Sequence, residues 1–176
     1  MLTAYEAADF FIELTQSEEE EFMTPLRLQK LLYFAQGWSL ARHGRPLFHE
    51  SIVAWKYGPV VREVYEKYKP YMANPIIQPT ARLDLIQGED LSLLLDVYRE
   101  YGCYTAKMLV RMTHQTKPWL DAVQGMEIPI ESMRSYFSAL TTQLPSFEDE
   151  IEQFLPVVEG YRDQNGVTIF PQERLT

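Results

Sequence analysis

The chain has 176 residues, of which 46% are hydrophobic and 23% charged, and it carries a formal net charge of -9. The length suits one compact domain, and the balance of apolar and charged residues is that of a globular protein. A nucleic-acid-binding protein has to neutralise phosphates, so the negative charge argues against direct DNA binding. The sequence has neither an apolar run of about 20 residues that could cross a bilayer nor the basic start of a signal peptide. The single cysteine excludes an intrachain disulfide. These absences predict a cytoplasmic protein without membrane contact.

The charge is unevenly distributed along the chain. Residues 1–23 carry seven acidic and no basic side chains, whereas residues 24–70 carry eight basic and three acidic ones. The basic side chains can pair with the acidic ends of the chain, or they can form a surface that attracts a partner. From this basic segment and its continuation we take eight candidate partner-binding residues: Gln29, Lys30, Arg42, Arg45, Lys56, Tyr57, Arg62 and Tyr71.

Two helices are predicted near the start of the chain. Thr3 and Glu6 have the spacing of a capping box, which predicts a helix over residues 4–15. Thr24 as N-cap and Pro25 as first helical residue begin a second helix. Its apolar residues recur at steps of three and four, so we expect this face to lie in the core; they are Leu28, Leu31, Leu32, Ala35 and Trp38.

Gln29 and Lys30 lie off that apolar face, which predicts that both are exposed. The substitution Lys30→Ala is then expected to cost within about 0.5 kcal/mol of stability. Tyrosine and tryptophan crowd residues 33–71. Most should lie in the core, but tyrosine beside basic residues is also a common anchor at protein interfaces.

A short strand is expected over residues 51–57, with residues 46–48 as a possible pairing partner. Gly58 and Pro59 are expected to stop this strand, and Pro59 to begin a third helix over residues 59–69.

The rest of the chain is predicted to consist of one long connection followed by further helices. Residues 70–89 contain three prolines and no helical period, which is typical of a functional or mobile loop. Further helices are expected over residues 91–101, 105–114, 118–124, 131–141 and 147–162, followed by an irregular tail or a short strand over residues 167–170. The predicted fold class is therefore mainly α: a compact single domain of about seven or eight helices with a short β-strand or hairpin near residues 46–57.

The sequence contains no recognisable catalytic or metal-binding motif. The three histidines, His43, His49 and His114, lack the spacing of a zinc site. Cys103 follows a glycine in an apolar context, so we expect it to pack in the core. The motifs of nucleotide sites and of serine hydrolases are also missing. We therefore expect no cofactor, no metal and no catalytic residue, with an enzyme built from distant residues around His43 and His114 as the alternative.

Three stretches together resemble the Panacea-domain family, also described as the phage-associated, SocA-like domain. The first is residues 23–38, Met-Thr-Pro-Leu-Arg-Leu-Gln-Lys-Leu-Leu-Tyr-Phe-Ala-Gln-Gly-Trp. The second runs from Leu47 to Tyr65 and contains Ala-Trp-Lys-Tyr-Gly-Pro-Val. The third is Leu109 followed by Thr-His-Gln-Thr-Lys-Pro-Trp over residues 113–119. The resemblance covers about residues 5–140 and divides the chain into a Panacea-like domain, 1–144, and a C-terminal helix and tail, 145–176.

The resemblance implies an antitoxin that neutralises a cognate toxin protein by direct binding. Some members of the family act instead as adaptors that deliver the toxin to a protease, so a protease is a possible second partner. Members are common in prophages, and an unrecognised prophage-encoded enzyme is the further alternative. The family has no established catalytic residues, so the resemblance assigns none to this chain.

Overall fold

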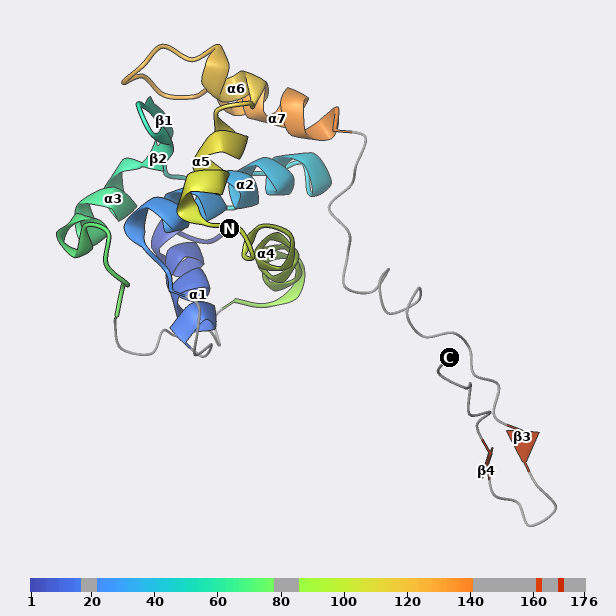
Figure 1. Ribbon diagram of the computed structural model, residues 1–176. Coiled ribbons are helices and arrows are strands. Elements are labelled where there is room, and N and C mark those ends of the chain that lie inside the picture. Colours follow the sequence, from blue (N-terminus) through green and yellow to red (C-terminus); the bar gives the residue numbers. More distant parts are fainter. Residues whose placement is uncertain (17–21, 78–85, 141–160, 163–167, 170–176) are drawn as a thin grey trace, which may run out of the picture. The chain divides into compact units, whose positions relative to one another are not determined.

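The structure, a computed structural model, describes residues 1–16, 22–77, 86–140, 161–162 and 168–169. The chain divides into two units, Met1–Leu144 and Pro145–Thr176. As predicted, the protein is mainly helical with a small antiparallel hairpin (Figure 1). None of the helices in the described ranges is both long and apolar enough to span a membrane.

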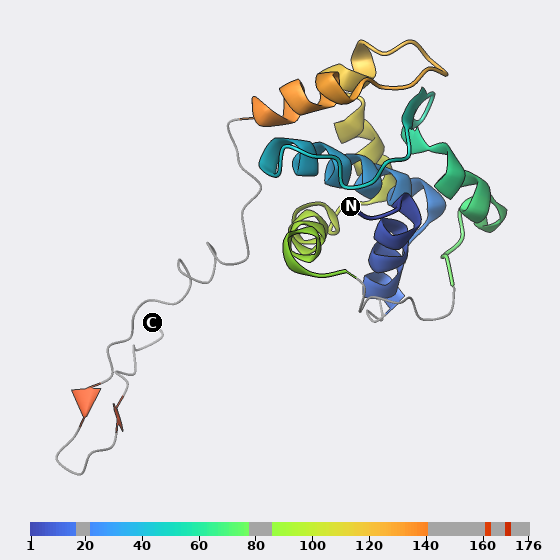
Figure 2. The same cartoon turned by 180° about the vertical axis from the view of Figure 1, so that it is seen from behind.

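Helix α2, Pro25–Arg42, is the centre of the first unit (Figures 1 and 2). The short helix α6 and helix α7 lie on one side of it and α1 and α4 on the other, while α5 crosses it. Their bounds are Ala4–Gln16 for α1, Gly88–Tyr101 for α4, Ala106–Thr113 for α5, Lys117–Leu120 for α6 and Ile130–Ser138 for α7. Every residue of α2 from Arg27 to Leu40 is buried, so this helix has no exposed face over its middle turns.

Helix α2 begins where the sequence predicts it. The Thr24 side chain accepts a hydrogen bond from the Arg27 N–H at 3.3 Å, and Pro25 is the first helical residue. His43 caps the C-terminus, and Gly44 follows with a φ of +66°, a backbone conformation that glycine adopts without strain. The predicted apolar face of this helix is confirmed as core.

A two-stranded hairpin follows, built from β1, Ile52–Trp55, and β2, Gly58–Val61. Trp55 pairs with Gly58, which leaves Lys56 and Tyr57 as a two-residue turn. Two predictions are therefore wrong: residues 46–48 are not the partner of β1, and Pro59 lies in a strand instead of beginning a helix. Proline is tolerated there because a two-stranded hairpin has only edge strands. Helix α3, Arg62–Tyr68, begins after β2 and continues into the 3-10 helix η1, Lys69–Tyr71.

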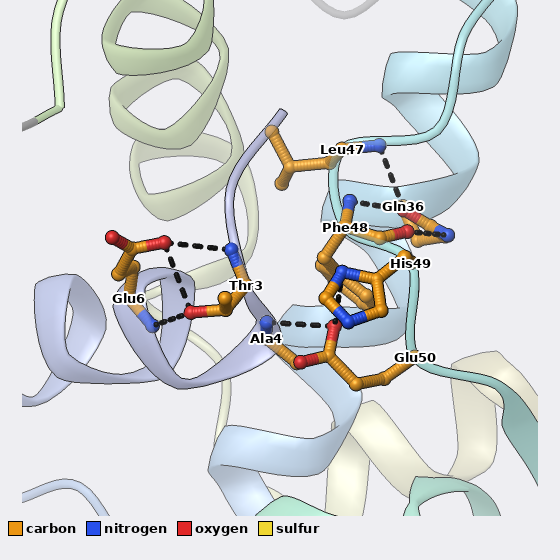
Figure 3. Close-up of polar contacts among 8 residues, drawn as sticks. All are labelled: Thr3, Ala4, Glu6, Gln36, Leu47, Phe48, His49 and Glu50. Carbon is orange, nitrogen blue, oxygen red and sulfur yellow. Dashed lines mark hydrogen bonds and ion pairs between the residues drawn. The ribbon is translucent and has the colours of Figure 1, made fainter.

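The segment before the hairpin is held by the start of the chain (Figure 3). The Leu2 N–H donates to the Leu47 carbonyl at 2.9 Å, and Leu2 forms a parallel bridge with Phe48. The Ala4 N–H donates to the Glu50 carboxylate at 2.9 Å, while Thr3 and Glu6 form the predicted capping box. At the start of α1, the Thr3 and Ala4 N–H groups thus donate to carboxylates, and the Glu6 N–H donates to the Thr3 hydroxyl.

Gln36 ties the same segment to α2 from the other side (Figure 3). Its Oε1 accepts the N–H groups of Leu47 and Phe48 at 2.9 and 3.2 Å, and its Nε2 donates to the Phe48 carbonyl at 3.0 Å. A buried glutamine amide therefore takes the place of a paired strand for these two residues.

Helix α7 packs on α2 through aromatic rings. Phe137 makes edge-to-face contacts with Tyr33 at 5.7 Å and with Trp38 at 5.6 Å between ring centroids. The close approach of the two helices places the Phe137 ring directly over Gly37. Met133 and Phe137 are buried, and Tyr136 is half-buried.

In the second unit, strands β3, Tyr161–Arg162, and β4, Thr168–Ile169, pair antiparallel. The short strand expected over residues 167–170 is confirmed at Thr168 and Ile169. The helix expected over residues 147–162 is wrong at its last two residues, and its other residues lie outside the described ranges.

Candidate partner-binding site

A hollow of about 520 Å³ lies at the N-terminal end of α2. We call it the α2–hairpin groove, because its walls come from the first turns of α2, the turn of the hairpin, and the α3–η1 segment. Its described lining residues are Pro25, Leu26, Gln29, Trp55, Lys56, Tyr57, Val60, Tyr65, Lys69, Met72 and Gln124. Most of these side chains are apolar or aromatic, which is typical of a binding site.

Aromatic packing fixes one wall of the α2–hairpin groove. The rings of Trp55 and Tyr65 meet edge to face, with centroids 4.8 Å apart and planes at 75°. The Trp119 indole N–H donates to the Trp55 carbonyl at 3.2 Å, so the end of β1 is held from the α6 side as well. The ring contact and the hydrogen bond together restrain Trp55 in this wall.

Three of the lining residues expose apolar surface to water. Met72 is 76% exposed, Tyr57 62% and Leu26 38%. Single exposed apolar side chains are ordinary on protein surfaces, but three around one hollow indicate a site for another molecule.

Met72 is held in a strained backbone conformation. Its φ is 55° and its ψ -110°, and it is the one described non-glycine residue with a positive φ. The Asn74 N–H donates to the Tyr71 carbonyl at 2.8 Å, so Met72 is the second residue of a β-turn. These angles are those of a type II′ turn, in which glycine is favoured at this position.

The charge in the α2–hairpin groove is positive. The described lining residues include Lys56 and Lys69 and no acidic side chain. Lys69 is paired with Glu66, and this hydrogen bond raises the pKa of the lysine. Lys56 lies over the Tyr57 ring, 5.4 Å from its centroid, and has no carboxylate within ion-pair distance in the described part of the chain.

Beneath the groove, α2 binds the hairpin through two buried polar side chains. Gln29 accepts the Val61 N–H at 2.7 Å and donates to the Val61 carbonyl at 3.3 Å. Lys30 donates from Nζ to the Pro59 carbonyl at 2.8 Å. The prediction that Gln29 and Lys30 are exposed is wrong, because a helix that is buried all round has no solvent face on which to place them. Lys30→Ala is therefore no longer expected to be neutral.

Lys30 is fully buried, and this burial lowers the pKa of its ammonium group to about 7. A Cβ atom at Gly58 would lie 2.8 Å from Lys30 Nζ and 2.9 Å from the Thr113 hydroxyl, so only glycine leaves room for the amine. The Lys30 charge also lowers the pKa of His114, after the larger effect of desolvation. Gln29 and Lys30 of α2 thus form one buried polar contact with β2.

The remaining candidate residues lie elsewhere on the unit. Arg42 pairs with Asp96 at 2.6 Å and Arg45 with Asp90 at 2.8 Å. At about 1.5 Å per residue, Arg42 is about 25 Å along α2 from Pro25, so these two arginines are not part of the groove. Arg62 lines a separate hollow of about 310 Å³. Tyr71 donates to the Ile77 carbonyl at 2.6 Å and precedes Met72 in the strained turn.

The histidines and the cysteine form no reactive cluster. His43 and His114 cap the C-termini of α2 and α5, and the His114 ring stacks on Trp119 at 3.9 Å. Cys103 is exposed, so the prediction that it packs in the core is wrong. Within the described residues, no three histidine, cysteine or acidic side chains lie close enough together to hold a metal.

Of the eight candidate residues, Gln29, Lys56 and Tyr57 line the groove, whereas its exposed apolar residues Leu26 and Met72 are not among the candidates. The signal for Leu26 is its place outside the three-and-four apolar pattern of α2. The signal for Met72 is an apolar side chain between Pro70 and Pro75 in a segment that cannot be a helix. Neither signal tells which hollow the side chain faces, since this depends on the tertiary fold.

Comparison with known proteins supports the resemblance found in the sequence. Residues 28–120 match the family described as antitoxin SocA-like, Panacea domain. Antitoxin SocA of Caulobacter vibrioides (strain NA1000 / CB15N) is 43% identical over 108 residues, which is 53% of this chain and 56% of that protein. The matched part thus spans little more than half the length of this relative. No solved structure matches the chain. The family match includes α2 from Leu28 onward, the whole hairpin and the Thr113–Trp119 motif, and by it this chain belongs to the SocA-like, Panacea-domain family.

Proposed function

We propose that this protein is a cytoplasmic antitoxin that binds a cognate toxin protein directly and holds it inactive without chemical turnover. The observation that carries the proposal is the 43% identity to a protein named antitoxin SocA. The part of the structure that is described adds support, because it has an open apolar groove suited to a protein ligand.

The test uses the product of the reading frame next to this gene. Expressed alone in a host, that product should arrest growth, and co-expression with this chain should restore it. The two purified proteins should elute together at a fixed ratio, with a nanomolar Kd, about -12 kcal/mol, because a toxin must be held almost fully bound. If growth is not restored and no complex forms, the proposal is wrong.

Delivery of the toxin to a protease gives a different result in the same cells. Direct neutralisation leaves the lifetime of the toxin unchanged, or lengthens it, when this chain is present. A shorter toxin lifetime that depends on a host protease would replace direct neutralisation with the adaptor mechanism.

A further inference from the structure

We propose that the α2–hairpin groove is where the toxin binds, and that it receives a toxin segment carrying an apolar side chain beside a carboxylate. This inference rests on the proposed function. It assigns the contact to the N-terminal end of α2 and the turn of the hairpin, and not to the arginines at the other end of α2.

The apolar part of the occupant follows from the shape and chemistry of the groove. Tyr57 and Met72 are mostly exposed lining residues, while the rings of Trp55 and Tyr65, also in the lining, pack edge to face. A volume of about 520 Å³ is enough for two or three side chains. An apolar side chain that enters between Tyr57 and Met72 removes both from water, and rigid aromatic anchors of this kind dominate the affinity of protein interfaces.

The acidic part follows from the charge at the rim. The whole chain carries a net charge of -9, yet the described lining of the groove contains two lysines and no acid. The Lys69 charge is already balanced by Glu66, whereas Lys56 has no ion pair among the described residues. A carboxylate of the partner next to Lys56 would complete this pair in a partly desolvated place, where an ion pair is stronger than on open surface.

The strain at Met72 is a separate argument for a binding role. A non-glycine residue at the glycine position of a type II′ turn lowers stability, and such residues cluster at binding sites. The Met72 side chain recovers little by packing, since it is mostly exposed. The strained turn holds an apolar side chain at the mouth of the groove, where a partner can cover it.

The experiment measures the Kd of the full chain for the purified product of the neighbouring reading frame by isothermal calorimetry. Tyr57→Ser and Met72→Gly are each expected to weaken binding about tenfold or more. Matched controls are Leu95→Ser on α4 and Met108→Ser on α5, two exposed apolar residues outside the groove. Both controls should bind within about twofold of the unmodified chain, since exposed residues outside an interface contribute little.

Substitutions of Lys56 test whether the partner segment is acidic. Lys56→Glu should weaken binding more than Lys56→Met, and Lys56→Met should reduce the salt dependence of the Kd. Lys107→Glu on α5 is the matched charge control and should leave the Kd unchanged. A Kd that improves with Lys56→Glu would overturn the acidic character of the partner segment.

The outcomes separate the two proposals. If the unmodified chain binds the toxin and all groove variants bind equally well, the groove proposal is wrong and the antitoxin proposal stands. If the unmodified chain does not bind or protect, the antitoxin proposal itself fails. A loss of binding in Met72→Gly counts only when its unfolding transition is retained, and circular dichroism checks this for every variant.

Discussion

The Phe137 ring lies so close to the Gly37 α-carbon that a Cβ atom there would come 2.2 Å from Phe137 Cε2. Alanine is a better helix former than glycine by about 1 kcal/mol. Gly37→Ala is nevertheless expected to destabilise the protein by about 1–3 kcal/mol, because the added methyl group forces α7 away from α2. Urea unfolding measures this. Adding Phe137→Leu should recover part of the loss, and strictly additive effects of the two substitutions would contradict the contact.

The buried amine of Lys30 leads us to expect that the free energy of unfolding rises with pH above neutrality. Burial lowers the pKa of Lys30 to about 7 in the folded protein, whereas it is about 10.4 in the unfolded chain. Between these values the unfolded state binds one more proton than the folded state, so the free energy of unfolding increases as the pH rises. Lys30→Met should remove this increase between about pH 7 and 9.5. Urea midpoints of both proteins at several pH values test it, and parallel curves would contradict a buried neutral amine.

Other titrations do not reproduce this effect. Burial raises the pKa of Tyr101 to about 12 and that of Tyr33 further, which lowers stability only above about pH 10, where unfolded tyrosine ionises. The lowered pKa of His114 affects stability only below about pH 6.5. The difference between the unmodified chain and Lys30→Met therefore isolates the lysine.

Gln36→Leu should cost about 2–4 kcal/mol of stability, because it leaves the buried N–H groups of Leu47 and Phe48 without acceptors. Amide hydrogen exchange should become faster at these two residues before it does elsewhere in the fold. Gln115→Leu, at an exposed glutamine, is the matched control and should change stability by less than about 0.5 kcal/mol. Unchanged protection at Leu47 and Phe48 would mean that the Gln36 amide does not hold this segment.

Met72→Gly is expected to stabilise the fold by about 0.5–2 kcal/mol. Relief of the positive-φ strain lowers the free energy of the folded state. This gain is larger than the stabilisation of the unfolded chain by the added conformational entropy of glycine. Ala73→Gly, one residue later and at a negative φ, should destabilise by about 0.5–1 kcal/mol. Thermal unfolding compares the two, and a loss of stability in both would argue against the type II′ turn.

Local patterns in the sequence predicted most of the helices and the N-terminal ends of α1 and α2. The capping box at Thr3 and the N-cap at Thr24 each satisfy backbone groups within a few residues, so neighbouring sequence determines them. The mainly helical fold class and the family were also predicted correctly.

The hairpin and the burial of Lys30 could not be predicted in the same way. Pro59 after glycine is equally compatible with a helix start and with an edge strand, and the choice depends on Gln29 and Lys30, which are distant in sequence. Polar residues in a helix normally mark its solvent face. Here they bind β2 inside the core, and only the packing of α2 on every side reveals it. The place of Leu26 and Met72 in the groove could not be predicted for the same reason, since tertiary packing brings them together with Lys56 and Tyr57.

The single cysteine limits how these molecules can become covalently joined. Cys103 is exposed, so air oxidation can link two chains through their thiols, but the dimer has no free thiol left to bond a third chain. A preparation without reductant should therefore contain monomers and one crosslinked dimer, and no ladder of larger species. A dimer that light scattering still detects in the presence of dithiothreitol is held by non-covalent contacts. This control is needed before the stoichiometry of the complex with the toxin is measured.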